Sequence, residues 1–80
     1  PCVSGGCTDP ACCSAGYKYE WPEVVGKSPQ VAKQIIEKDN PYVAVMIQPG
    51  DGVKPPDFCC NRVVVFLDCY GIVRDVPIVG

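Results

Sequence analysis

Seven of the 80 residues are cysteine, and no other feature of the sequence constrains the fold as strongly. A chain of this length buries only about 60–65% of its unfolded surface, so its hydrophobic core is marginal and covalent cross-links would add to it. Cysteine at this density in a short chain is typical of oxidising, extracytoplasmic compartments. We therefore expect one small, disulfide-bonded domain that is secreted, and a two-domain enzyme is excluded.

The alternative use of so many cysteines is a metal-binding thiolate cluster. The sequence contains no histidine and no Cys-x-x-Cys pair, which are the usual ligands of structural zinc. We therefore expect no metal and no other cofactor. Because seven is odd, at least one thiol is free, joined to another chain, or paired with a partner outside this sequence.

Charge and hydropathy argue against two classes of partner. Seven basic and nine acidic side chains give a net charge of −2 without long runs of either sign, so we expect no nucleic acid partner. The longest uncharged apolar stretch, Pro41 to Gly50, is too short to span a membrane, so we expect no membrane partner. The chain begins at Pro1 without a signal peptide, as expected of a mature chain whose leader has been removed.

Residues 1–20 differ from the rest of the chain. They contain four cysteines, three glycines and two prolines, and their apolar residues follow neither a helical nor a strand period. We predict that they form a loop-rich arm held by disulfides. Residues 21–80 would then form the folded domain.

The domain contains one clear helix signal. Ser28 is a favourable N-cap and Pro29 suits the first helical position, where its missing N–H costs nothing. The helix is predicted to run to about Asp39, with Ala32 and Ile36 on its apolar stripe, and Asn40-Pro41 stops it.

Two apolar, β-branched runs predict the main strands. Residues 42–47 should form a strand that is covered on both faces, or at least on one by the helix, and residues 63–67 a second strand. Residues 68–71 are predicted to turn the chain into Ile72-Val73. The piece 76–79 contains Pro77 and is therefore expected at a sheet edge. One helix against a small sheet is an α+β fold.

The connection between the two main strands is long and rich in proline and glycine. Residues 48–62 contain Pro49, Gly50, Gly52, Pro55 and Pro56. Long ordered loops in compact domains are commonly functional, and a stiff, extended loop loses little entropy when it binds. This loop is therefore predicted to bind a partner that recognises extended peptide.

Several motifs, in order, resemble the potato inhibitor I family of serine protease inhibitors. The resemblance covers about residues 21–80, with Cys13 corresponding approximately to a cysteine that plant members carry before the Trp-Pro pair. The motifs are Trp21-Pro-Glu-Val-Val-Gly-Lys-Ser28, the helix residues Ala32 and Ile36, the Pro49-Gly-Asp-Gly52 entry to the loop, Asp57-Phe58, Cys60-Asn-Arg-Val63, Phe66 and the closing Val76-Pro-x-Val-Gly80.

The resemblance implies both a fold and a function. The fold would be a helix packed on a small mixed sheet, with an exposed binding loop between two parallel strands. The function would be inhibition of serine proteases, not catalysis, and the sequence has no histidine to act as a general base. By resemblance, the loop that enters the protease cleft like a substrate comprises Val53, Lys54, Pro55, Pro56, Asp57 and Phe58. The reactive bond would be Pro56–Asp57.

The resemblance also implies how the loop is supported. Arg62 should donate hydrogen bonds to Asp57, a charge-assisted brace. A second arginine of many members is replaced here by Val64. Cys13–Cys60 is the first disulfide implied. Cys59 is then expected to pair with Cys12 or another cysteine of the arm.

The residue before the reactive bond sets the expected target. Pro56 suits neither trypsin, which needs a cation there, nor chymotrypsin, which needs a large ring. We therefore expect an elastase-like, subtilisin-like or proline-accepting serine protease. The alternative is a protein of inhibitor fold that no longer inhibits and has a binding, structural or defence role.

Overall fold

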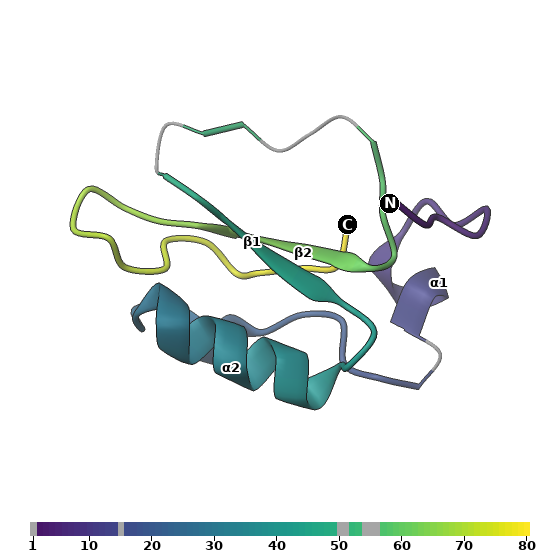
Figure 1. Cartoon of the computed structure of the whole chain (residues 1–80), viewed down its shortest axis with the longest axis horizontal. Helices are drawn as coiled ribbons and strands as arrows, with labels where there is room; N and C mark the ends of the chain where they lie inside the picture. Colours follow the sequence, from purple (N-terminus) through teal and green to yellow (C-terminus); the bar gives the residue numbers. More distant parts are fainter. Residues whose placement is uncertain (1, 15, 50–51, 54–56) are drawn as a thin grey trace.

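The computed structural model describes residues 2–14, 16–49, 52–53 and 57–80 (Figure 1). Helix α2 lies against one side of the strands β1 and β2, and the described residues 52–53 of the connection between them lie on the other side. Among the described residues, no helix is long and apolar enough to cross a membrane. The elements in chain order are α1 (Pro10–Ser14), the 3-10 helix η1 (Pro22–Val24), α2 (Pro29–Asp39), β1 (Ala44–Gln48) and β2 (Arg62–Phe66).

Helix α2 begins and ends as the sequence predicts. The Ser28 hydroxyl accepts a hydrogen bond from the Val31 N–H at 3.3 Å, and Pro29 occupies the first position. The Asn40 N–H donates to the Ile36 carbonyl at 2.9 Å, and the helix stops before Pro41. The apolar stripe of α2 faces the sheet, and Ala32 and Ile36 on this stripe are fully buried, as the sequence predicts.

The expected α+β fold with a small mixed sheet is confirmed. Strands β1 and β2 are parallel, with a register that runs from Ala44↔Arg62 to Gln48↔Phe66. Antiparallel bridges add Val73 opposite Leu67 and Val79 opposite Val63. The turn at 68–71 forms as predicted, because the Gly71 N–H donates to the Asp68 carbonyl at 3.0 Å.

The burial of β1 matches the second of the two alternatives, cover by the helix, and one other expectation about burial is corrected. Helix α2 packs against β1 and Val45 is half-buried against the core, whereas Met46 and Ile47, which point to opposite faces of the strand, remain exposed. Pro77 is buried and does not lie at an open edge. Residues 77–79 run between β2 and residues 19–21, and this pairing uses the Pro77 carbonyl and the Val79 N–H, so the absent proline N–H does not interrupt it.

The hydrophobic core lies between α2, the sheet and the segment that precedes η1. Trp21 is fully buried at its centre, and its Nε1 donates to Asp39 Oδ2 at 3.1 Å. Cys13 is partly buried against the same core. The buried cluster consists of Trp21, Val24, Ala32, Ile36, Val43, Val63, Val65, Val73 and Val79.

Asn40 is the buried polar side chain of the described core, and its substitution should be costly. Its Nδ2 donates to the Lys18 carbonyl at 3.2 Å, and its Oδ1 accepts from the Tyr42 N–H at 3.1 Å. Asn40→Ala leaves both backbone groups without a partner, so we expect a loss of about 2–3 kcal/mol in the free energy of unfolding, measured with guanidinium chloride.

The matched control is Gln34→Ala on the exposed face of α2, which should change the free energy of unfolding by less than about 0.5 kcal/mol. An Asn40→Ala protein as stable as this control would show that Asn40 does not hold the two backbone groups.

Residues 2–14 belong to the arm predicted from the sequence, and they contain a turn and a short helix that the sequence pattern did not reveal. The Cys7 N–H donates to the Ser4 carbonyl at 2.8 Å, which closes a turn through Gly5 and Gly6, both with positive φ. Helix α1 follows, and Asp9 Oδ1 accepts from the Cys12 N–H at 3.0 Å. Asp9-Pro10 is a helix start signal. The helix α1 contains only five residues, Pro10 included, which is too few to give a hydrophobic period.

Candidate functional site

The candidate site is the loop between β1 and β2. Because these strands are parallel, the loop must cross from one end of the sheet to the other. Of the six residues expected to bind, Val53, Asp57 and Phe58 are described. Val53 is 83% exposed. Lys54, Pro55 and Pro56, and with Pro56 one side of the expected reactive bond, lie outside the described residues.

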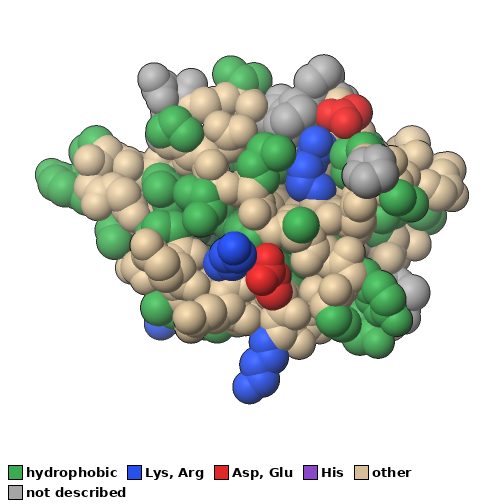
Figure 2. Space-filling view, in the orientation of Figure 1, with side chains coloured by type: hydrophobic (Ala, Val, Ile, Leu, Met, Phe, Trp, Pro, Cys, Tyr) green, Lys and Arg blue, Asp and Glu red, His purple; other side chains and the backbone are tan. Residues whose placement is uncertain are grey.

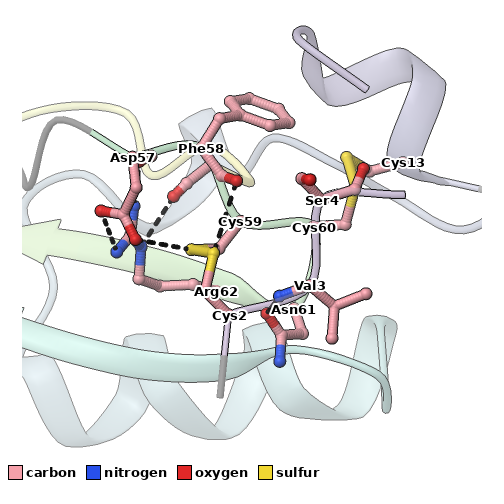
Figure 3. The surroundings of a disulfide bond; sticks show 11 residues. Cys2, Val3, Ser4, Cys13, Asp57, Phe58, Cys59, Cys60, Asn61 and Arg62 are labelled. Atoms are coloured by element: carbon pink, nitrogen blue, oxygen red, sulfur yellow. Dashed lines mark hydrogen bonds and ion pairs between the residues drawn. A yellow bond between two sulfur atoms is a disulfide. The ribbon is translucent and has the colours of Figure 1, made fainter. Parts of the chain in front are cut away.

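Arg62 braces the loop from the first residue of β2. Its Nη1 lies 3.3 Å from Asp57 Oδ1, which is the expected ion pair, and its Nη2 also donates to the Asp57 carbonyl at 2.6 Å (Figure 3). Its Nε donates to the Gly80 carbonyl at 2.8 Å. The Arg62 side chain is only 12% exposed, so water screens these contacts less than it would on an open surface. Arg62 thus ties the loop to the end of the domain.

Two disulfides hold the chain directly after Asp57 and Phe58. All seven cysteines lie within the described residues, and six of them form the disulfides Cys13–Cys60, Cys2–Cys59 and Cys7–Cys12. Cys13–Cys60 is the pairing that the resemblance implied. Cys59 pairs with an arm cysteine as expected, but this is Cys2 and not Cys12.

The short helix α1 explains why Cys2 and not Cys12 pairs with Cys59. Cys12 and Cys13 are adjacent on it and therefore point about 100° apart. Cys13 faces the core and Cys60, whereas Cys12 faces Cys7 at the end of the preceding turn. Spacing alone does not predict this difference between the two neighbours, because α1 is too short to leave a hydrophobic period.

The arm also forms hydrogen bonds with the residues at the base of the loop. The Cys60 N–H donates to the Val3 carbonyl at 2.6 Å, and the Val3 N–H donates to Asn61 Oδ1 at 3.1 Å. Figure 3 shows this arm segment running beside Cys59 to Asn61. Sequence reasoning missed the roles of Asn61 and Gly80. Both lie in the quoted motifs, but a motif does not state which atoms its residues contact.

Val64, at the position of the second arginine, cannot brace the loop. It is 5% exposed in the middle of β2, and its aliphatic side chain has no hydrogen-bond donor. In the described residues, the contacts that hold Asp57 to Asn61 include those of Arg62, the two disulfides, Val3 and the Ala44 N–H, which donates to the Asn61 carbonyl at 2.9 Å.

Six of the seven cysteine sulfurs form disulfide bonds. Among the described residues, two groups of side chains are close enough to share a metal ion. Cys7, Cys13 and Cys60 offer only disulfide-bonded sulfurs, and Cys2, Asp57 and Cys59 offer two bonded sulfurs and one carboxylate. A bonded sulfur is not a thiolate, which is the form that binds metal. The odd cysteine is Cys69, a free and exposed thiol in the 68–71 turn.

A helix on a small mixed sheet, with a braced loop between two parallel strands, is the architecture of a solved trypsin inhibitor, and the relatives described below are protease inhibitors, not enzymes. Residues 13–80 match the model of the potato inhibitor I family, and the chain belongs to this family. The match includes Cys13 and the rest of the segment that leads to Trp21.

Relatives of known activity are similar over most of their length. The subtilisin-chymotrypsin inhibitor CI-1C of Hordeum vulgare is 40% identical over 67 residues, which cover 84% of this chain and 87% of the relative. The inhibitor of trypsin and Hageman factor of Cucurbita maxima is 44% identical over 64 residues, which cover 79% and 93%. The crystal structure of bitter gourd trypsin inhibitor superposes with a TM-score of 0.77 at 38% identity, covering 80% of this chain and 94% of that one.

Proposed function

We propose that this protein inhibits serine proteases by presenting residues 53–58 as a substrate whose reactive bond, Pro56–Asp57, is cleaved very slowly. The observation that carries the proposal is the grip of Arg62 on both the carboxylate and the carbonyl of Asp57. A loop that is already ordered loses little entropy in the protease cleft, and its binding energy appears as affinity.

The brace acts on the leaving side of the proposed bond. After cleavage, the new amino group would belong to Asp57, which Arg62 and the Cys2–Cys59 and Cys13–Cys60 disulfides keep in place. An amine that cannot diffuse away remains close to the acyl-enzyme and attacks it again, which favours re-formation of the bond over hydrolysis. The supports found in the structure therefore suit an inhibitor better than a substrate.

The proposal is tested by incubating the folded protein with subtilisin, elastase, chymotrypsin, trypsin and a proline-accepting serine protease. We expect tight inhibition of at least one of them, and slow cleavage between Pro56 and Asp57 with inhibition retained, mapped by mass spectrometry. Rapid cleavage at other bonds, without a stable complex, would overturn the proposal.

Pro56 is proposed to direct the protein to elastase-like, subtilisin-like or proline-accepting enzymes rather than to trypsin. Trypsin inhibitors occur among the relatives, so the scaffold itself does not exclude trypsin. Pro56→Lys should therefore lower the Ki for trypsin by at least roughly 100-fold, because the specificity pocket then receives the cation that it requires.

Lys54→Ala provides the matched control for this prediction. In the Pro56→Lys protein it should change the Ki for trypsin by far less than roughly 100-fold, since Lys54 is followed by proline on the leaving side and does not supply the residue before the cleaved bond. If Pro56→Lys gave no trypsin inhibition, or if the inhibition required Lys54, the assignment of the reactive bond would be wrong.

Secretion is part of the same proposal. Three disulfides in 80 residues fit an oxidising compartment, where they form and persist. A role in defence against foreign proteases would follow from secretion and inhibition together.

Two features favour a second candidate, a protein of inhibitor fold that binds or protects without inhibiting. Pro55 and Pro56 restrict how the loop can adapt to a cleft, and buried Val64 cannot supply the second arginine brace. Uniform failure of the panel to form complexes, with slow trimming of the loop by many proteases, would favour this candidate.

A further inference from the structure

Residues 2–12 of the arm take up a defined structure without contributing to the hydrophobic core. None of the described residues 2–12 is buried, and none belongs to the core cluster. Fixing the backbone of a residue costs about 1–2 kcal/mol, and buried apolar surface normally offsets this cost. Here the Cys7–Cys12 and Cys2–Cys59 bonds and the Ser4–Cys7 turn hold the segment instead. The arm thus presents a rigid surface that the core does not require.

This surface lies beside the leaving side of the reactive bond. Cys2 is bonded to Cys59, two residues after Asp57, and the Val3 carbonyl accepts from the Cys60 N–H. Figures 1 and 3 show the arm next to the end of the loop that descends into β2. A protease that held Asp57 and Phe58 in its cleft would have the turn at residues 4–8 at the rim of that cleft.

The chemistry of the turn suits protein contact. Residues 2–8 carry no charged side chain, and residues 2–6 and Thr8 are exposed. On the face drawn in Figure 2, the arm end at the right shows only hydrophobic and uncharged atoms. Gly5 and Gly6 have no side chains and leave their backbone groups accessible to a partner. A surface without charges costs less to desolvate than a charged one, and its backbone groups can be satisfied by hydrogen bonds from the partner.

We propose that the turn formed by residues 4–8 is a second contact surface for the target protease, on the leaving side of its cleft. This inference depends on the proposed function. A stable protein–protein interface uses about 20–30 residues on each side, which the six residues of the loop cannot supply alone. The arm turn is an exposed surface without charges, and the Cys2–Cys59 bond and the hydrogen bond from the Cys60 N–H to the Val3 carbonyl join it to the base of the loop.

Two substitutions at exposed arm positions test the contact with subtilisin as the probe. Ser4→Arg and Thr8→Arg each add a large charged side chain and leave the disulfides and the loop sequence unchanged. We expect each to raise the Ki by about tenfold or more, mainly through faster dissociation. Gln34→Arg, on the exposed face of α2, should leave the Ki within about twofold.

A second measurement covers the case in which the variants misfold. In the unaltered protein, binding of subtilisin should slow hydrogen exchange at the amides of Gly5, Gly6 and Thr8, whereas amides on the exposed face of α2 should not change. An arm that merely stiffens the loop would show neither the exchange protection nor the loss of affinity in both arginine variants.

The outcomes separate this inference from the proposed function. If the unaltered protein inhibits subtilisin but both arginine variants retain its Ki and the arm amides exchange as in the free protein, the contact surface is refuted and the inhibitor remains. If the unaltered protein inhibits no protease of the panel, the proposed function fails and the arm contact fails with it.

Discussion

Arg62→Ala should raise the Ki for subtilisin by roughly 100-fold and accelerate cleavage of the Pro56–Asp57 bond, because it removes a brace worth about 2–4 kcal/mol. Arg62 makes two contacts with Asp57 and one with the Gly80 carbonyl, and its side chain is mostly buried. Without them, the loop would have to be ordered by the protease at the moment of binding. Inhibition assays and a time course of cleavage measure the two effects.

Two further arginine variants control for charge and for general destabilisation. Arg62→Lys keeps the charge but loses the planar fork that reaches the carboxylate and the carbonyl of Asp57 and the carbonyl of Gly80. The Ki of the Arg62→Lys protein should therefore be close to that of the Arg62→Ala protein. Arg74→Ala alters an exposed pair with Asp75, which is expected to contribute less than about 1 kcal/mol. Equal inhibition by Arg62→Ala and Arg74→Ala would mean that the brace does not set the affinity.

Removing both disulfides between the arm and the loop base should cost about 7 kcal/mol in the free energy of unfolding. The Cys13–Cys60 bond closes a long loop, and its loss accounts for about 4 kcal/mol. Once that bond is in place, Cys2–Cys59 closes only the short ring formed by residues 2–13 and 59–60, so its loss accounts for about 3 kcal/mol. The whole stability of a small domain is about 5–15 kcal/mol, so the protein with serine at all four positions should be unfolded or barely folded.

The stepwise variants locate the effect. The protein with Cys2→Ser and Cys59→Ser alone should lose about 3 kcal/mol and remain folded, which calorimetry and guanidinium chloride unfolding would show. Cys69→Ser removes a free, exposed thiol and should change the free energy of unfolding by less than about 0.5 kcal/mol. A four-serine protein as stable as the two-serine protein would contradict the role given to Cys13–Cys60.

The sequence was sufficient for the features that depend on local chemistry. Ser28 and Pro29 define the start of α2 because capping involves atoms only three residues apart. The Arg62–Asp57 brace and the Cys13–Cys60 bond followed from ordered motifs that resemble one family. The target preference implied by Pro56 stays a prediction.

Features set by distant parts of the chain were left open or missed. The exposure of Met46 and Ile47 was left open, because an apolar run has the same pattern whether one face of the strand or both are covered. Pro77 suggested an edge, yet residues 19–21 pair with its carbonyl side. The partner of Cys59 depended on α1, which is too short to leave a period in the sequence.

The disulfide connections determine what becomes of the molecule when its loop is cut. A break between residues 56 and 57 divides the chain into two pieces, one containing Cys2 and Cys13 and the other Cys59 and Cys60. Both inter-piece bonds span the break, so the nicked protein remains a single covalent molecule. The severed ends then meet at the effective concentration of an intramolecular reaction, which does not fall when the protein is diluted.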